Sequence, residues 1–263
     1  MKFCLSNLAW SKKENIKIIE LLNQKKINLL EYAPTLILKN LNSDDEIKNV
    51  RKFWEINKIK LYSMQSILFE IKDAYIFGNI KERKKFLIEV KKKIILANKL
   101  GTKIIVFGSP KTKKTFGKSK KKLNQIFYNM FKKIASISAK YNIIFCIESN
   151  PKFYKTTFLT HTKNALYFVK KINSRNLKIN LDLGTVTYNK ENLDELLEDN
   201  INLIGHAQIS SPGLRNLLRY KKQTKHFLRK LNNYGYKKVV SVESLGGRYD
   251  NYKKVKKILK LIK

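Results

Sequence analysis

The chain has 263 residues and carries 56 Lys and Arg against 20 Asp and Glu, a formal net charge of +36. Such a charge suggests a nucleic-acid partner. However, only seven of the basic residues are Arg, and the chain is also rich in Asn and Ile, the bias that AT-rich codon usage produces. We therefore expect no specific nucleic-acid partner. No apolar stretch approaches the ~20 residues of a membrane span, so no membrane partner is expected either.

The N-terminal MKFCLSNLAW lacks the apolar core and the cleavage site of a signal peptide. The two cysteines, Cys4 and Cys146, lie in apolar runs and are too few for a disulfide framework. Buried free thiols are typical of a reducing compartment. These features predict a cytoplasmic protein.

Short apolar runs rich in β-branched residues alternate with amphipathic segments along the whole chain. The predicted strands are 3–9, 28–33, 60–66, 103–108, 143–148, 177–182, 203–209 and 239–244. Segments between them, such as 14–26, 84–101 and 123–141, repeat apolar residues every three or four positions, as helices do. Eight such units predict a single-domain (β/α)₈ TIM barrel over residues 1–263. A doubly wound sheet is disfavoured because no Gly-rich phosphate loop follows the first strand.

Acidic residues are scarce, yet several predicted strands end in one. In a (β/α)₈ barrel the functional groups lie at these carboxyl ends. Strands five, six and eight end in Glu148, Asp182 and Glu243, and strand seven ends in Gln208. Clustered carboxylates repel one another unless a cation lies between them. We therefore predict a metal bound by Glu148, Asp182, Gln208 and Glu243, and these oxygen donors favour Mg²⁺ or Mn²⁺.

The sequence resembles the xylose-isomerase-like TIM barrels, the sugar isomerases and epimerases that include D-tagatose 3-epimerase and hydroxypyruvate isomerase. The resemblance spans essentially the whole chain. It is carried by MQSILFE (64–70), LGTKIIVFGSPK (100–111), IESNPKFYKTTFLT (147–160), LDLGTV (181–186), GHAQIS (205–210) and VES (242–244). By this resemblance the metal ligands fall at the same four residues.

Two positions depart from the pattern of the epimerases. Their seventh-strand ligand is usually His, where this chain has Gln208, although some dehydratases of the superfamily use Gln there. Their D-x-x-H motif reads Asp182-Leu-Gly-Thr185 here, without the substrate-binding His. Arg215 lies near the place of an epimerase Arg, one residue out of register.

The resemblance implies an isomerase or epimerase that acts on a sugar, sugar phosphate or keto acid through an enediolate. Glu148 and Glu243 would act as the catalytic pair, one removing the proton next to the carbonyl and the other returning it. The metal would act as a Lewis acid. The residues expected to contact the substrate are Asn7, Trp10, Gln65, Lys111, Asn150, Thr185, His206 and Arg215.

Several of these assignments compete with structural roles. His206 shares a strand face with Gln208, and a core histidine bonded to a carboxylate is favoured over a substrate contact. Trp10 could be ordinary packing. Lys111, the candidate for a substrate phosphate or carboxylate, belongs to a loop with seven lysines in residues 108–122, which could be simply solvated.

Alternative functions are a metal-dependent dehydratase of the same fold and a non-catalytic barrel acting as an accessory binding protein. An endonuclease IV-like DNA-repair enzyme is disfavoured because its three-metal site needs several histidines, and this chain has three in all. Formation of a homo-oligomer is left open by the sequence.

Overall fold

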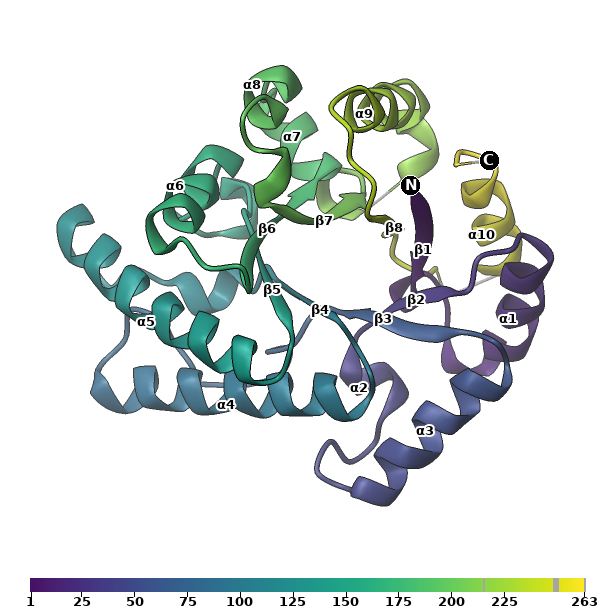
Figure 1. The fold of residues 1–263 in the computed structure, drawn as a ribbon, viewed down its shortest axis with the longest axis horizontal. Helices are drawn as coiled ribbons and strands as arrows, with labels where there is room; N and C mark the ends of the chain where they lie inside the picture. The colour runs from purple at the N-terminus through teal and green to yellow at the C-terminus, as the bar shows by residue number, and fades with distance from the viewer. Residues whose placement is uncertain (215, 248–250, 263) are drawn as a thin grey trace.

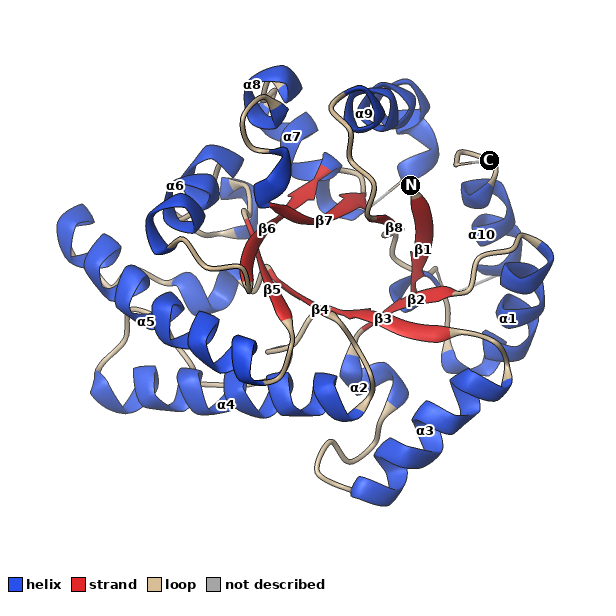
Figure 2. Ribbon diagram, viewed as in Figure 1, coloured by secondary structure: helices blue, strands red, loops and turns tan. Residues whose placement is uncertain are grey.

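The computed structural model describes residues 1–214, 216–247 and 251–262. Eight parallel strands follow one another around a closed barrel, and β8 pairs with β1. Helices cover its outside (Figures 1 and 2). The strands are Lys2–Ser6 (β1), Leu29–Tyr32 (β2), Lys60–Met64 (β3), Ile104–Phe107 (β4), Ile144–Glu148 (β5), Leu177–Asp182 (β6), Ile204–Ile209 (β7) and Val239–Val242 (β8). The predicted (β/α)₈ barrel is confirmed.

The segments between strands contain α-helices and short 3₁₀ turns. The α-helices are Asn15–Gln24 (α1), Pro34–Ile37 (α2), Asp44–Ile56 (α3), Ile80–Lys99 (α4), Lys120–Lys140 (α5), Thr162–Ile172 (α6), Leu183–Asn189 (α7), Leu193–Leu197 (α8), Lys221–Asn233 (α9) and Asn251–Leu259 (α10). The 3₁₀ turns are Asn7–Ala9, Lys12–Glu14, Pro110–Lys113, Lys152–Tyr154, Ile201–Leu203, Pro212–Leu214 and Leu217–Tyr220. Within the described ranges, no helix is both long and apolar enough to cross a membrane.

Helix α4 shows how local sequence sets a helix boundary. The Asn79 side chain accepts a hydrogen bond from the backbone N–H of Glu82 (3.0 Å), and the Glu82 carboxylate accepts one from the N–H of Asn79 (2.7 Å). This reciprocal capping box satisfies two N–H groups that the first helical turn leaves without partners. The helix therefore begins at Ile80, four residues before the segment predicted from apolar spacing.

The core between the barrel and its helices is rich in phenylalanine. Phe107 of β4 and Phe145 of β5 contact Phe131 of α5, with ring centroids 5.6 and 6.2 Å from it, and Phe127 stacks on Phe131 at 3.9 Å. All four side chains are fully buried. Aromatic pairs of this kind contribute about 0.5–1.5 kcal/mol beyond the area that they bury. They fix α5 against the strands that precede the functional loops.

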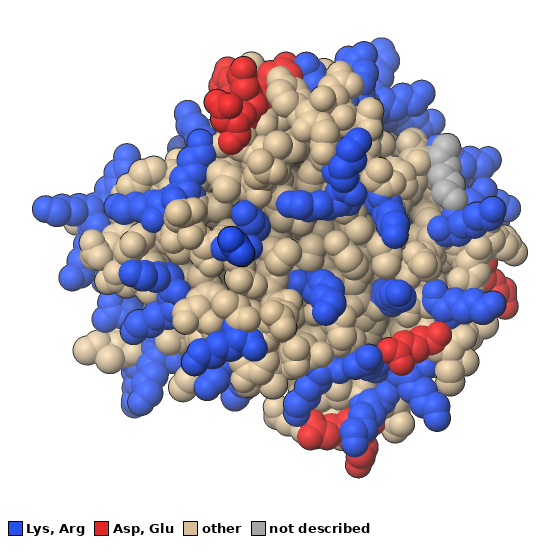
Figure 3. Space-filling view, viewed as in Figure 1, with Lys and Arg blue, Asp and Glu red and all other residues tan. Residues whose placement is uncertain are grey.

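Basic side chains are numerous on the face of the molecule that Figure 3 shows, and they do not form a single stripe there. On the face shown in Figure 3, Lys and Arg are scattered over most elements, and acidic side chains form small separate groups. A nucleic-acid-binding surface usually gathers its basic residues on one face or along one helix. The expectation that the charge does not mark a specific nucleic-acid partner stays a prediction.

Candidate active site

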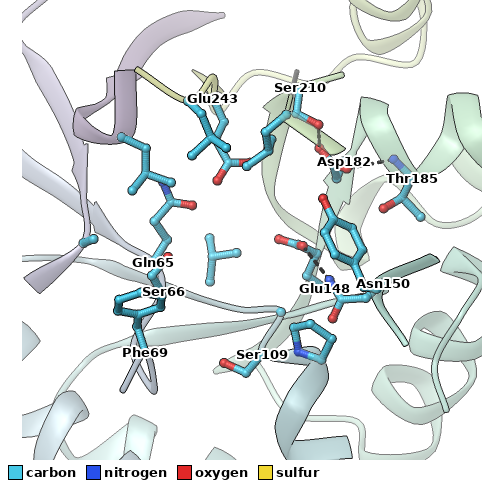
Figure 4. A pocket seen from close by; sticks show the side chains of 18 of the residues that line it. Gln65, Ser66, Phe69, Ser109, Glu148, Asn150, Asp182, Thr185, Ser210 and Glu243 are labelled. Carbon is cyan, nitrogen blue, oxygen red and sulfur yellow. Dashed lines mark hydrogen bonds between the residues drawn. The ribbon is translucent and has the colours of Figure 1, made fainter. Parts of the chain in front are cut away.

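A cavity of about 390 Å³ opens at the carboxyl ends of the barrel strands (Figure 4). Each of the eight strands contributes residues at its end or in the loop that follows. The described residues lining it are Leu8, Ala33, Thr35, Leu36, Gln65, Ser66, Phe69, Val106, Gly108, Ser109, Pro110, Glu148, Asn150, Tyr154, Asp182, Thr185, Ser210, Leu214, Glu243 and Leu245. The cavity lies where (β/α)₈ barrels hold their functional groups.

Three carboxylates face this cavity, as the sequence predicted. Glu148 ends β5, Asp182 ends β6, and Glu243 directly follows β8, held there by the bond from its N–H to the Ile209 carbonyl (2.9 Å). In Figure 4 the side chains of Glu148 and Glu243 reach into the space from different sides. The barrel thus gathers three acidic groups that are up to 95 positions apart in the chain, from Glu148 to Glu243.

The carboxylates are crowded by protein atoms and by one another, although Glu148 and Glu243 keep some exposure through the cavity. Desolvation and the negative charge of Asp182 raise the pKa of Glu148 to about 8. Desolvation also raises the pKa of Asp182. The pKa of Glu243 is raised well above its ordinary range by desolvation and by the charges of Glu148, Glu31 and Asp182. The site therefore favours bound protons or a bound cation.

Amide and hydroxyl groups orient the carboxylates. Asn150 and Asn180 donate to the two oxygens of Glu148, at 3.1 and 2.9 Å. Asp182 accepts hydrogen bonds from the hydroxyl of Ser210 and from the backbone N–H of Thr185, the latter at 2.8 Å. Asp182 thereby caps α7, so its position is fixed by the start of that helix.

Gln208 lies beneath the cavity and is not among its lining residues. The amide is fully buried; its nitrogen donates to Glu31 (2.8 Å) and Gln65 (3.3 Å), and its oxygen accepts from Asn180. This arrangement gives Gln208 protein partners at both ends of its amide. Gln65 lines the cavity directly above, and its amide donates to Ser6.

His206 occupies the same buried layer. Its Nε2 pairs with a Glu31 oxygen at 2.9 Å, which confirms the expected core histidine bonded to a carboxylate. Its Nδ1 is buried and has no hydrogen-bond partner among the described residues. Glu31 itself is fully buried. His206 thus lies inside the barrel, and it is not among the residues that line the cavity.

Other residues expected to contact the substrate divide into two groups. Asn150 and Thr185 line the cavity. Asn7 accepts from the N–H of Ala33 (3.0 Å), Trp10 donates to Asn15 (2.8 Å), and neither lines the cavity. Lys111 is exposed and is also absent from the cavity wall. Arg215 lies outside the described residues.

Lys113, Tyr154 and Ser210 were not predicted from the sequence as part of the site. Lys113 is fully buried beside Glu148, and burial lowers its pKa to about 7 despite the opposing charge of Glu148. Tyr154 lines the cavity, and burial raises the pKa of its hydroxyl. No local pattern distinguishes Lys113 from its lysine neighbours, whereas Tyr154 lies inside the IESNPKFYKTTFLT stretch that carried the family resemblance.

The residues at the cavity fit a divalent cation in charge and donor type. Three carboxylates with raised pKa values supply hard oxygen donors, which suit Mg²⁺, Mn²⁺ and related ions. The spacing of the side chains does not yet fit a metal ion, because across the described ranges no group of three or more His, Cys, Asp or Glu side chains is placed so that it could hold one. Binding would therefore require the carboxylates to move inward, and the metal site stays a prediction.

Solved structures of two sugar epimerases and of a zinc-binding protein share the fold. The chain matches the apo 3-keto-D-glucoside 4-epimerase YcjR from E. coli with a TM-score of 0.80 at 15% identity, covering 100% of this chain and 99% of that one. A D-psicose 3-epimerase from Clostridium cellulolyticum H10, with D-tagatose, matches at 0.71 and 17%, covering 93% and 85%. The IolI protein with a binding zinc atom matches at 0.74 and 14%, covering 100% and 96%.

Comparison at the level of sequence gives the family. No curated protein matches the chain. The family model described as xylose isomerase-like TIM barrel matches residues 19–263, which covers seven of the eight strands. The chain therefore belongs to the xylose isomerase-like TIM barrel family.

Proposed function

We propose that the protein is a divalent-metal-dependent isomerase or epimerase of a sugar or sugar derivative. The observation that carries the proposal is the convergence of Glu148, Asp182 and Glu243 on one cavity at the carboxyl ends of the strands. The family membership and the sugar epimerases among the structural neighbours support it.

The carboxylate pair can move a proton to and from carbon. An ionised carboxylate accepts the proton next to a carbonyl, and a protonated one returns it. Glu148 and Glu243 come from strands that are not neighbours, β5 and β8, and both have raised pKa values. Their mutual repulsion disfavours ionisation of both at once, so at least one of the two tends to hold a proton that it can return to carbon. Such a pair suits transfer between two sides of a bound sugar.

Amides at the cavity would hold and orient the substrate. Gln65 and Asn150 both line it, and Asn150 also bonds to Glu148. Amide side chains offer both donors and acceptors, which match the hydroxyl and carbonyl groups of a sugar. Thr185 adds a hydroxyl at the place where the epimerases carry His, although this hydroxyl donates to the Ser149 carbonyl (3.1 Å).

Glu148, Asp182 and Glu243 would hold the divalent cation. Gln208 would join them only if its oxygen left Asn180. When bound, the ion would polarise the substrate carbonyl and so acidify the neighbouring C–H bond. The structural neighbour with a zinc atom supports a divalent ion, and the oxygen donors favour Mg²⁺ or Mn²⁺.

The test measures exchange of substrate protons with solvent deuterium, together with turnover. Glu148→Gln and Glu243→Gln keep an oxygen at each position but remove the carboxylate that accepts a proton. We expect each variant to lose about 10²–10⁴-fold in turnover on a substrate found in a panel of ketoses, with Mg²⁺ or Mn²⁺. The variant without the initial base should lose exchange as well, and the other should retain exchange from one face.

Glu20→Gln is the matched control, because Glu20 is exposed on α1, outside the cavity. It should behave as wild type. Wild-type protein that shows neither turnover nor exchange across ketoses, keto acids and their phosphates would contradict the proposal and favour the accessory-protein alternative.

A further inference from the structure

Lys113 is unusual among the basic residues that the structure describes, because its side chain is fully buried. Removing an ammonium group from water costs several kcal/mol unless it is hydrogen-bonded or paired. The Lys113 nitrogen donates to the side-chain oxygen of Asn150 (2.6 Å) and to the backbone carbonyl of Glu148 (3.2 Å). Both partners belong to the segment that presents Glu148 to the cavity.

The loop after β4 is built to place this lysine. Ser109 adopts a left-handed backbone conformation (φ 37°), from which the 3₁₀ turn Pro110–Lys113 begins. Thr112 closes the turn, since both its N–H and its hydroxyl donate to the Ser109 carbonyl, at 3.1 and 2.8 Å. The Thr112 carbonyl in turn accepts from the N–H of Ile76 (2.9 Å). Lys113 therefore enters the interior from a tightly bonded turn.

The bond to Lys113 decides which way round the Asn150 amide lies. An ammonium group only donates, so it can pair with the amide oxygen and not with the amide nitrogen. With its oxygen held, Asn150 directs its nitrogen to one oxygen of Glu148 (3.1 Å). Asn150 is itself almost fully buried, so the amide has little freedom to exchange these partners for water.

We propose that Lys113 is a positioning residue that orients the Glu148 carboxylate through Asn150. Lys113 is not among the residues that line the cavity. This role rests on the proposed function, in which Glu148 is the group that is oriented. The same turn offers a contrast, because Lys111 lies two residues earlier and is exposed.

The first experiment requires neither metal nor substrate. Lys113→Met keeps an unbranched chain of similar length and removes the ammonium, and Lys111→Met is the matched control. We expect the Asn150 side-chain NH₂ resonances in proton–nitrogen NMR spectra to shift or broaden in Lys113→Met and to match wild type in Lys111→Met. Unchanged Asn150 resonances in a folded Lys113→Met would overturn the proposal.

The second experiment measures binding of Mn²⁺ alone by electron paramagnetic resonance. Partners that orient metal ligands typically change metal affinity 10–100-fold, so we expect Lys113→Met to bind Mn²⁺ about tenfold more weakly and Lys113→Arg to recover part of the loss. A lysine that acted only through its charge would repel the cation, and Lys113→Met would then bind Mn²⁺ more tightly. That result would overturn the proposal.

A double-mutant cycle with Asn150→Ala tests the route of the effect. If Lys113 acts through Asn150, Lys113→Met should change Mn²⁺ affinity far less in the Asn150→Ala background than in wild type. Equal effects in both backgrounds would overturn the proposal. Wild-type protein that binds no Mn²⁺ would count against the proposed function, while the NMR comparison would still decide the role of Lys113. If Lys113→Met does not fold, Lys113→Arg and Asn150→Ala carry the same comparisons.

Discussion

Glu31 offers the sharpest test of how the barrel interior is held together. It is the last residue but one of β2 and is fully buried, and its two oxygens accept four hydrogen bonds from three other strands. One oxygen accepts from Ser63 (2.8 Å) and His206 (2.9 Å), and the other from Gln208 (2.8 Å) and Ser241 (2.8 Å). We expect Glu31→Gln to destabilise the protein although it changes the side-chain volume very little.

The size of this destabilisation follows from counting the hydrogen-bond donors around Glu31. The amide of Glu31→Gln has one NH₂ group, which must replace one of the two accepting oxygens. Serine hydroxyls can turn to accept from it. Besides its serine, each Glu31 oxygen accepts from a nitrogen, which is His206 Nε2 at one oxygen and the Gln208 amide at the other. Reversing the Gln208 amide would not help, because it would turn the Gln208 NH₂ group toward the NH₂ group of Asn180. At least one buried N–H therefore loses its partner, which costs about 1–3 kcal/mol of the free energy of unfolding.

Urea unfolding followed by circular dichroism measures this cost, and for a chain of this size it corresponds to a fall of about 2–12 °C in Tm. The exposed Glu20→Gln is the control and should change stability by less than about 0.5 kcal/mol. A Glu31→Gln variant as stable as wild type would refute the count of donors, because it would mean that the network rearranges without loss.

The difference in stability between wild type and Glu31→Gln should depend on pH, and the pKa of Glu31 sets the direction. Burial alone would raise the pKa of Glu31, but the bonds from His206, Gln208 and Ser241 outweigh it, and the pKa lies below the ordinary 4.5. The ionised form therefore contributes stability that is fully present above about pH 4.5 and is lost as the pH falls through the lower folded value. The difference in the free energy of unfolding between wild type and Glu31→Gln should therefore become smaller below pH 4.5.

Three further changes test other parts of the structure by thermal or urea unfolding. Phe127→Ala should cost about 3–5 kcal/mol, because it empties a fully buried position in the phenylalanine core. Gly205→Ala should also destabilise, since a Cβ there would lie 2.6 Å from the sulfur of Cys146. Asp194→Asn should lower Tm slightly near neutral pH and not at acid pH, because the bond from Lys230 lowers the pKa of this exposed carboxyl; salt should shrink the effect.

The fold and part of the site were predictable because they rest on local patterns. Apolar runs alternating with amphipathic segments located all eight strands. The rule that functional groups lie at strand ends then selected Glu148, Asp182 and Glu243, and all three line the cavity. This part of the prediction needed only the order of the strands and the positions of their ends.

The rule that functional groups lie at strand ends does not place Gln208 correctly. It pairs in register with Asp182, yet only Asp182 lines the cavity. Closing a sheet into a barrel staggers the strands, so residues paired in register lie at different heights along the barrel axis. The residue that reaches the cavity there is Ser210, two positions after Gln208 and directly after the end of β7. The stagger is a property of the closed barrel and leaves no mark on a single strand.

The burial of Lys113 could not be predicted from the sequence, for a different reason. Seven lysines lie within residues 108–122, and their composition gives no sign of which one is buried. The choice depends on the backbone of Ser109 and on the hydrogen bonds that close the following turn. A left-handed serine is not predictable from its neighbours, because such conformations depend on the surrounding structure to hold them.

The acidic groups of this barrel separate into two layers by how well they are satisfied. Glu31, in the lower layer, accepts four hydrogen bonds, and its pKa is lowered. Glu148 and Glu243, in the upper layer, face the cavity and one another, and their pKa values are raised. All three lie within one residue of the end of a strand, so position along the strand alone does not distinguish them. A carboxylate whose bonds are complete stabilises the fold, whereas one that is short of positive charge can take up a proton or a cation. The number of hydrogen bonds and the nearby charge, more than position along the strand, therefore distinguish Glu148 and Glu243 from Glu31, and they are the reason that we propose the upper pair for proton transfer.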